Sequence, residues 1–394
     1  MPAISKSTRP GAGKLKDRVT KMPHGEREHF PHPPIFRFTS GIYSDCNELK
    51  AGAQDVLKSD YPRYSRFGTP VTDAVEHELT HLERGYGSLS ACSGLAAITS
   101  VLLSFLRPGD HMLITRSVYE PVRRYVMTYL SRLGISATFL SSREFTQLER
   151  YVTENTTLIY VESPSSNVFE VTDIEVVAQF AKLRGIVTIM DNTWSTPLLL
   201  NPLRYGFDVV IHSASKYLSG HSDAIIGTIT TTEQYYNPLR RYLIASGMCA
   251  GGEESFSLYK GLKTLALRLT AQQKTTQGLT EMLTTHPAVR RVVSPVLPAH
   301  TDHEVFRKYY QQGNGIFSFA VTKPKDSQRD VFLRRLAHFK LAYGWGGTES
   351  CIIPFSAPDW LPESDGLSFF RISVGIEEEG MLKTELSTAL LELM

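Results

Sequence analysis

A lysine with two serines just before it follows a short apolar segment near the middle of the chain. Lys216 is preceded by Ser213 and Ser215, which come directly after the apolar residues 209–211. A lysine at the end of a buried strand is partly desolvated, and its neutral amine can attack an aldehyde to form a Schiff base. The serine hydroxyls beside it can donate hydrogen bonds to a phosphate. On its own, this arrangement also suits a solvated surface lysine.

An aspartate stands at a comparable place one strand earlier. Asp191 follows the apolar residues 186–190. A carboxylate there can pair with the protonated nitrogen of an aromatic ring, and such a positive ring accepts electrons from a carbanion. A lone aspartate could also be a helix cap or a loop residue. The functional interpretation gains weight because Asp191 and Lys216 both follow strands, and parallel strands end at the same edge of a sheet.

A turn rich in small residues is the third feature. Residues 93–95 read Ser-Gly-Leu and lie between a predicted strand and a predicted helix. Gly94 permits close approach of the backbone, and the amides of Gly94 and Leu95 at the start of the helix can bind a phosphate. Neither GxGxxG nor GxxxxGK[ST] occurs, so this is not a nucleotide loop of those types. An ordinary turn remains the alternative.

Two further side chains are candidates for contacts with a small molecule. Arg371 lies in the apolar stretch 369–374, where a cation is costly unless it is paired. Its planar guanidinium suits a substrate carboxylate, although a structural ion pair would explain it equally well. Tyr119 follows the predicted strand 111–115 and could stack on a flat ring or simply fill the core.

Alternating strands and helices from about residue 70 predict the frame that positions these side chains. Such alternation indicates βαβ units around a mostly parallel sheet, hence an α/β fold. Thr72 is predicted to cap the first helix, which ends before Gly85. The other predicted strands and helices are, in order, 88–92, 95–106, 111–115, 121–133, 157–162, 173–184, 186–190, 209–212 and 224–230.

Three parts of the chain differ in pattern. Residues 1–60 are rich in Pro, Lys and Arg and are predicted to be an arm on a neighbouring subunit, with a floppy tail as the alternative for residues 1–25. Residues 61–255 form the predicted large domain. Residues 256–394 form a smaller α+β domain. Its predicted elements are 258–283, 315–322, 330–336, 369–374 and 381–393.

Composition excludes several classes of protein. The chain has 394 residues, 42% of them hydrophobic, and its net charge of +2 gives no reason to expect a nucleic acid or a membrane as partner. No apolar run reaches the ~18 residues of a membrane span, and the first residues do not resemble a secretory signal. The four cysteines are widely spaced, which favours free thiols. We therefore expect a soluble, cytoplasmic protein.

Together these stretches resemble the Cys/Met-metabolism enzymes of fold type I, which use pyridoxal 5′-phosphate (PLP). The matching stretches occur in the same order over about residues 60–390. Within the family, the sequence is most similar to bacterial cystathionine β-lyases. Ser166 supports the β-lyases, because γ-lyases and γ-synthases usually carry Asn there. The matching stretches are YSRFGT (64–69), SGLAA (93–97), VYEP (118–121), ESP (162–164), DNTW (191–194), SASKYLSGHSD (213–223), KGLKTL (260–265) and AYGWGGTES (342–350).

The resemblance implies a role for each matching residue. It implies a Schiff base between Lys216 and PLP, pairing of Asp191 with the pyridine nitrogen, and stacking of Tyr119 on the ring. It also implies that Arg371 binds the substrate carboxylate. The residues implied to hold the phosphate are Gly94, Leu95, Ser213 and Ser215, with Tyr64 and Arg66 reaching it from the neighbouring subunit. Tyr64, Gly344 and Trp345 are further expected substrate contacts, in a homotetramer built from dimers.

The implied reaction is β-elimination from L-cystathionine, which gives homocysteine, pyruvate and ammonia. Phe67 replaces a second arginine of the related β-lyases, and Arg123 and Arg124 stand where those enzymes can carry an acidic residue. These changes concern the distal end of the substrate, so another cysteine S-conjugate is also a candidate. Within the family, γ-lyase, γ-synthase and sulfhydrylase activities stay open.

A different class of protein is suggested by one motif. Residues 77–81, HELTH, fit the HExxH pattern of zinc proteases, in which two histidines bind the metal and the glutamate is the base. The next helix supplies no third ligand, and Arg84 replaces the glycine of the extended motif. We therefore expect no metal, and a solvated or interface helix face is the plainer interpretation.

Overall fold

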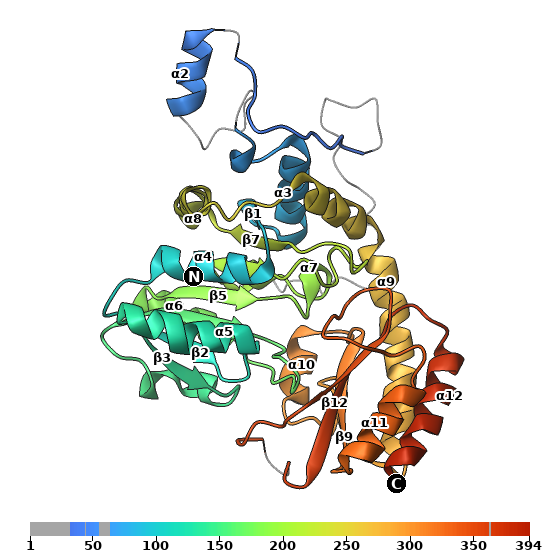
Figure 1. The fold of residues 1–394 in the computed structure, drawn as a ribbon. Coiled ribbons are helices and arrows are strands. Elements are labelled where there is room, and N and C mark those ends of the chain that lie inside the picture. The colour runs from blue at the N-terminus through green and yellow to red at the C-terminus, as the bar shows by residue number, and fades with distance from the viewer. Residues whose placement is uncertain (1–31, 44, 55–63, 362–363) are drawn as a thin grey trace, which may run out of the picture.

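The computed structural model describes residues 32–43, 45–54, 64–361 and 364–394 (Figure 1). Of the predicted N-terminal arm it therefore shows only part, including the short helix α2 (Cys46–Gln54). Ser40 forms an isolated β-bridge with Tyr64, and Arg37 pairs with Glu253. Our prediction of a tail at residues 1–25 lies outside the described residues.

A seven-stranded sheet forms the centre of the larger part of the molecule (Figure 1). The five neighbouring strands β6, β5, β4, β2 and β3 run parallel to one another, whereas β7 is antiparallel to both of its neighbours, β1 and β6. A mostly parallel sheet was predicted, and it is confirmed. The strand order is β1 (Gly87–Ala91), β7 (Gly227–Thr231), β6 (Val209–His212), β5 (Val187–Asp191), β4 (Thr156–Glu162), β2 (His111–Thr115) and β3 (Ser136–Leu140).

Helices cover both faces of this sheet, which is why most residues of its strands are buried. One face packs against α4 (Gly94–Phe105), α5 (Glu120–Tyr125) and α8 (Glu233–Ser246). The other face packs against α6 (Ile174–Arg184) and against residues of the smaller part. The helix α3 (Pro70–Glu83) packs through Val75, Leu79 and Leu82.

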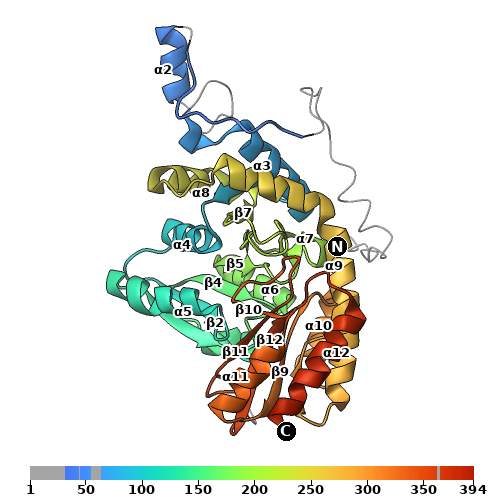
Figure 2. The ribbon, with the colours of Figure 1, turned by 45° about the vertical axis from the view of Figure 1, so that its right-hand side comes forward.

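The helix α9 (Gly252–Thr285) leads into the smaller part, which is built on a second sheet (Figure 2). That sheet packs against α9, α11 (Asp326–Arg335) and α12 (Glu379–Leu390), while α10 (His303–Tyr309) packs with the larger part. This is the smaller α+β part that we predicted. Its strand order is β10 (Lys340–Leu341), β11 (Cys351–Phe355), β12 (Leu367–Ser373), β9 (Ile316–Thr322) and β8 (Val289–Val293).

Some predicted boundaries are wrong for local reasons. Thr69, not Thr72, caps α3, because Pro70 suits the first helical position and the Thr69 hydroxyl accepts from the Thr72 amide. The predicted helix 121–133 is α-helical only to Tyr125 and continues as a π-turn and a 3₁₀ turn. Among the described residues no helix is long and apolar enough to span a membrane.

Candidate active site

The carboxyl ends of β4, β5 and β6 meet at one edge of the larger sheet. Glu162 and Asp191, the last residues of β4 and β5, are register partners, and Asp191 is the partner of Ile211 in β6. Lys216 follows β6 after a short loop. The parallel sheet therefore brings Asp191 and Lys216 to the same edge, as predicted from their positions after strands.

Asp191 is a buried carboxylate with one oxygen well satisfied. Its Oδ1 accepts hydrogen bonds from the Thr193 amide (3.0 Å) and hydroxyl (2.5 Å). Its Oδ2 accepts, within the part of the chain that the structure describes, only from the Tyr160 hydroxyl at 3.3 Å. Burial raises the pKa of Asp191, and the Thr193 hydrogen bonds and the nearby His212 oppose that rise. A cationic N–H group placed beside Oδ2 would stabilise the ionised form of this carboxylate.

Lys216 has the environment of a nucleophilic amine. Its Nζ lies 5.6 Å from the centre of the Trp345 ring. Burial, with a smaller contribution from the charge of Arg371, lowers the pKa of Lys216. A larger fraction of the side chain is therefore neutral and able to attack a carbonyl carbon than for a lysine in water.

The start of α4 forms a close cradle with the loop before Lys216. Ser93 caps α4, its hydroxyl accepting from the Ala96 amide at 3.0 Å. A Cβ at Gly94 would lie 2.7 Å from the Ser213 side chain, so only glycine fits there without a shift. The first amides of a helix have no partner within it, which makes this cradle suitable for a phosphate.

The two predicted phosphate-binding serines differ in their surroundings. The Ser213 amide donates to the Thr193 hydroxyl at 2.8 Å, which links this loop to the Asp191 site. The Ser215 hydroxyl donates to the Ile226 carbonyl (3.1 Å) and accepts from the Ile226 amide (2.9 Å). Ser215 would therefore have to give up its bond to that carbonyl before its proton could reach a phosphate.

Tyr119 stands at the start of α5 and close to the buried carboxylates. Its amide donates to Glu162 at 2.7 Å, and its side chain is half exposed. Burial and the Glu162 charge raise the pKa of the phenol, and Arg371 opposes them. The side chain therefore lies near both Asp191 and Arg371 and is half exposed, which a core tyrosine would not be.

Arg371 projects from β12 of the smaller sheet without a carboxylate partner. Its Nη2 donates to the Tyr343 carbonyl at 2.8 Å and its Nη1 lies 3.5 Å from the Asn167 side-chain oxygen. Among the described residues (32–43, 45–54, 64–361 and 364–394), none forms an ion pair with it, and burial lowers its pKa to about 10. The structure thus gives no support to a structural ion pair and leaves the guanidinium able to bind an external carboxylate.

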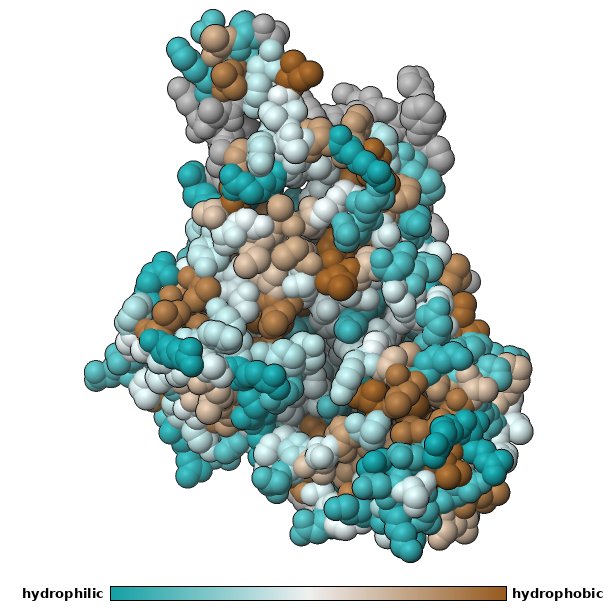
Figure 3. Space-filling view, viewed as in Figure 1, coloured by the Kyte–Doolittle hydropathy of each residue, from teal (hydrophilic) through white to brown (hydrophobic). Residues whose placement is uncertain are grey.

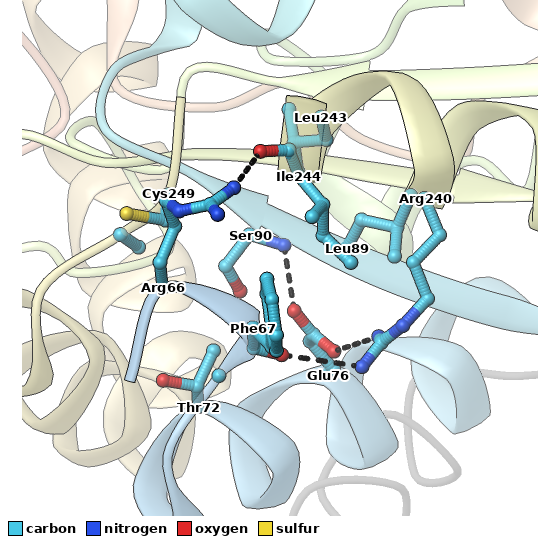
Figure 4. Close-up of a pocket in the computed structure, with 12 residues that line it drawn as sticks. Arg66, Phe67, Thr72, Glu76, Leu89, Ser90, Arg240, Leu243, Ile244 and Cys249 are labelled. Carbon is cyan, nitrogen blue, oxygen red and sulfur yellow. Dashed lines mark hydrogen bonds and ion pairs between the residues drawn. The ribbon is translucent and has the colours of Figure 1, made fainter. Parts of the chain in front are cut away.

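Tyr64 and Arg66 lie elsewhere on the same chain. Arg66 lines a pocket with Phe67, Glu76 and Arg240, and its guanidinium donates to the Ile244 carbonyl (Figure 4). Tyr64 is exposed. No contact among the described residues joins either residue to Lys216, and their role at the phosphate of a neighbouring subunit stays a prediction.

The remaining predicted substrate residues lie in one loop before β11. Trp345 packs edge-on against Tyr217 with ring centres 5.4 Å apart, next to Lys216. Gly344 is exposed and a Cβ there would meet nothing within 4 Å. Trp345 therefore belongs to the cluster around Lys216, and the predicted role of Gly344 stays a prediction.

Two buried groups near this cluster had no role in our sequence analysis. The Glu162 side chain accepts from the Tyr119 amide and from the Ser166 hydroxyl, both at 2.7 Å, and burial next to Asp191 raises its pKa. His212 contacts Glu83 of α3, and both side chains are fully buried. The strand-end position of Glu162 matches that of Asp191 and is a signal that could have indicated it; the contact of His212 with Glu83 has no such local signal.

A comparison with protein families agrees with this geometry. The model of the family described as "Cys/Met metabolism PLP-dependent enzyme" matches residues 20–391, and the chain belongs to that family. Its cofactor is PLP, and its fold is that of fold type I.

Individual relatives carry different activities in their names. A cystathionine beta-lyase of Lactococcus lactis subsp. cremoris is 36% identical, over 83% of this chain and 88% of its own. A cystathionine gamma-lyase of Bacillus subtilis is 35% identical over the same shares. An L-alanine/L-glutamate racemase of Wolbachia pipientis is 31% identical, over 92% and 93%. The crystal structure of metB from Corynebacterium glutamicum superposes with a TM-score of 0.86 at 27% identity, covering 98% and 99% of the two chains.

The residues present fit PLP. Asp191 offers a buried oxygen for a pyridinium nitrogen, Lys216 a partly neutral amine for an aldehyde, and the Gly94 cradle an opening that a side chain would close. Each of these features is matched to one functional group of the cofactor. The fit depends on residues from two strand ends and one helix start, and local packing alone does not require this combination.

Proposed function

We propose that the protein is a carbon–sulfur β-lyase that cleaves L-cystathionine to homocysteine, pyruvate and ammonia. The observation that carries the proposal is the cluster of Lys216, Asp191 and Arg371. These residues supply an amine, a buried carboxylate and an arginine that has no acidic partner among the described residues. The resemblance of residues 118–121 and 216–223 to β-lyases, with Ser166 in place of Asn, favours elimination at Cβ.

Each proposed residue has a separate task in this reaction. PLP, when bound, supplies a ring that accepts the electrons left at Cα. The Asp191 carboxylate keeps the ring nitrogen protonated, and Arg371 fixes the α-carboxylate of the substrate. The free Lys216 amine would remove the Cα proton of the substrate. The thiolate then leaves from Cβ, and the released enamine hydrolyses to pyruvate and ammonia.

Tyr119 and the cradle residues complete the proposed site. Tyr119 is proposed to stack on the cofactor ring from the accessible side that its half-exposed ring allows. Gly94, Leu95, Ser213 and Ser215 are proposed to bind the phosphate. Trp345 closes one side of the Lys216 amine and limits the entry of water.

The residues expected at the distal end of the substrate depart from those of related β-lyases. Arg123 donates to the Arg116 carbonyl and lies over the Phe139 ring at 4.2 Å, so it is turned onto its own domain. Arg124 is exposed and pairs with Glu120 at 3.8 Å. We infer that other cysteine S-conjugates, without cystathionine's second amino-acid group, are also substrates.

We further propose that the enzyme is a cytoplasmic homotetramer of dimers that acts in transsulfuration and methionine biosynthesis. Tyr64 and Arg66 would reach the phosphate bound by the neighbouring subunit. Their positions away from Lys216 in a single chain support this arrangement. We also propose that residues 61–255 and 256–394 are the two domains, since each range holds one complete sheet.

Product analysis with L-cystathionine tests the proposal. We expect pyruvate and homocysteine in equal amounts, and no product from the Lys216→Ala variant. Formation of 2-oxobutyrate and cysteine would assign the γ-lyase activity instead. Racemisation of L-alanine without pyruvate would place the chain with its Wolbachia relative and contradict the proposal.

A further inference from the structure

Two histidines on α3 approach each other closely at the surface. His77 and His81 are one helical turn apart and both are exposed. Their rings are nearly perpendicular, at 77°, with centres 4.4 Å apart, and their Nε2 atoms are separated by 3.2 Å. The two rings thus meet through the nitrogen atoms that commonly bind metals.

The separation of these nitrogens matches that of two ligands on one metal ion. Two metal–nitrogen bonds of about 2.05 Å that enclose an angle of about 100° place their nitrogens about 3.2 Å apart. This angle lies between those of square-planar and tetrahedral coordination. The helix already holds the two atoms at this distance, so little conformational freedom would be lost when an ion binds.

We propose that His77 and His81 form a bidentate site for a divalent transition-metal ion. In a neutral pair, one ring donates its Nε2 hydrogen to the Nε2 atom of the other ring, which carries its own hydrogen on Nδ1. The ion takes the place of the shared hydrogen, which moves through water to Nδ1 of its own ring, so both neutral rings then carry one hydrogen on Nδ1 and no net proton is released. Imidazole ligands select Ni²⁺, Cu²⁺ or Zn²⁺ over Mg²⁺, which prefers oxygen ligands. Water fills the remaining positions.

The site is not that of a zinc protease, although it uses the histidines of the HExxH motif. Glu78 is buried and faces Lys263 of α9, on a different side of α3 from the two histidines. Within the described ranges no set of three or more His, Cys, Asp or Glu side chains could hold a metal. The motif therefore provides a chelate without a third protein ligand and without a general base.

The proposed metal site is independent of the proposed lyase activity. Neither histidine belongs to the cluster around Lys216, and the apolar side of α3 is buried by Val75, Leu79 and Leu82. Binding would link two turns of α3 and stabilise the folded protein, because the unfolded chain does not hold the two rings together.

Calorimetric titration of the holoenzyme with Ni²⁺, Co²⁺ and Mg²⁺ tests the site. We expect the wild type to bind one more Ni²⁺ ion than either variant, His77→Gln or His81→Gln. At this site the wild type should bind Ni²⁺ more tightly than Co²⁺ and should not bind Mg²⁺. Each substitution should lower the Ni²⁺ affinity of the site by more than about tenfold, which is the loss expected when a residue that only hydrogen-bonds to a metal ligand is removed. Exposed thiols of Cys46 and Cys92 also bind metals, so the difference between variant and wild type is the quantity to compare.

His286→Gln is the matched control. His286 lies at the end of α9, and the hydrogen bond described for its side chain is the one that Nδ1 accepts from the nearby Ala288 amide. It should bind Ni²⁺ as the wild type does. Ni²⁺ should also raise the Tm of the wild type and the control, but raise it less in the two variants. Equal Ni²⁺ binding and an equal rise in Tm in wild type and both variants would overturn the proposal, whatever the enzymatic activity.

Discussion

At the scale of single residues, the balance between burial and charge decides what each group can do. Lys216 and Arg371 are cations that burial disfavours, and each has a lowered pKa. Asp191 is a carboxylate that burial also disfavours, and its pKa is raised. Shifted pKa values of this kind are typical of functional sites. Binding of a negatively charged phosphate and carboxylate and of a cationic ring would favour the charged forms of these groups.

The lowered pKa of Lys216 predicts a pH dependence of stability in the protein freed of PLP. The unfolded chain binds a proton on this lysine at pH values where the folded chain has already released it. Its contribution to stability therefore increases as pH rises from the lowered pKa towards 10.5, by at most about 1.4 kcal/mol per pH unit.

Urea unfolding of the PLP-free wild type and of Lys216→Met between pH 7 and about 10.5 measures this effect. The stability advantage of Lys216→Met over the wild type should shrink as pH rises. A constant difference between the two proteins over this range would show that Lys216 has an ordinary pKa.

Arg371 should govern substrate affinity more than turnover. Arg371→Gln removes the charge-assisted bonds to the α-carboxylate, each worth about 1.5–3 kcal/mol, so we expect KM for L-cystathionine to rise about tenfold or more. Steady-state kinetics checks this, with the visible spectrum of PLP as evidence that the cofactor stays bound. An unchanged KM would remove Arg371 from the substrate site.

At the scale of elements, the start of α4 is the place where backbone geometry has the most direct functional consequence. Gly94→Ala would place a methyl group 2.7 Å from the Ser213 side chain. The resulting shift should cost about 1–3 kcal/mol and weaken PLP binding accordingly. Gly252→Ala is the control, because a Cβ there meets its nearest neighbour at an ordinary 3.6 Å.

Equilibrium dialysis of PLP against the two glycine variants gives the comparison. Gly94→Ala should lose PLP affinity, and Gly252→Ala should keep it. If both variants bind PLP as the wild type does, the α4 cradle does not hold the phosphate.

Much of the fold and of the cluster follows from local sequence, whereas other parts depend on distant contacts. Strands such as β2 and β6 are continuous apolar runs, and the sequence predicts their limits correctly. The edge strand β3 is half polar and was not predicted, because its pairing with β2 rather than its own composition stabilises it. Asp191 and Lys216 were recognisable because they end strands, but the contact of His212 with Glu83 joins β6 to α3 and has no sequence pattern.

At the scale of the whole molecule, the proposed assembly predicts active sites that are shared between subunits. Figure 3 shows apolar patches separated by polar surface on one face of the single chain. Exposed apolar side chains include Met127, Tyr129 and Leu133 beyond α5. If Arg66 serves the neighbouring site, the assembled enzyme contains active sites made from two chains.

Mixing two inactive variants tests shared sites. A Lys216→Ala chain and an Arg66→Ala chain together form one intact site in each mixed dimer, so random pairing should restore about a quarter of wild-type activity. The mixture is unfolded, refolded together and assayed for pyruvate. Activity no higher than that of the separate variants would show that Arg66 acts within its own chain or not at all.

The covalent attachment of PLP tests the central claim most directly. Borohydride reduction of the holoenzyme, followed by proteolysis and mass spectrometry, should place one phosphopyridoxyl group per chain on Lys216, in the peptide that contains Ser213 and Ser215. A label on another lysine, or a reduced protein without any label, would contradict the assignment of Lys216 and with it the proposed lyase.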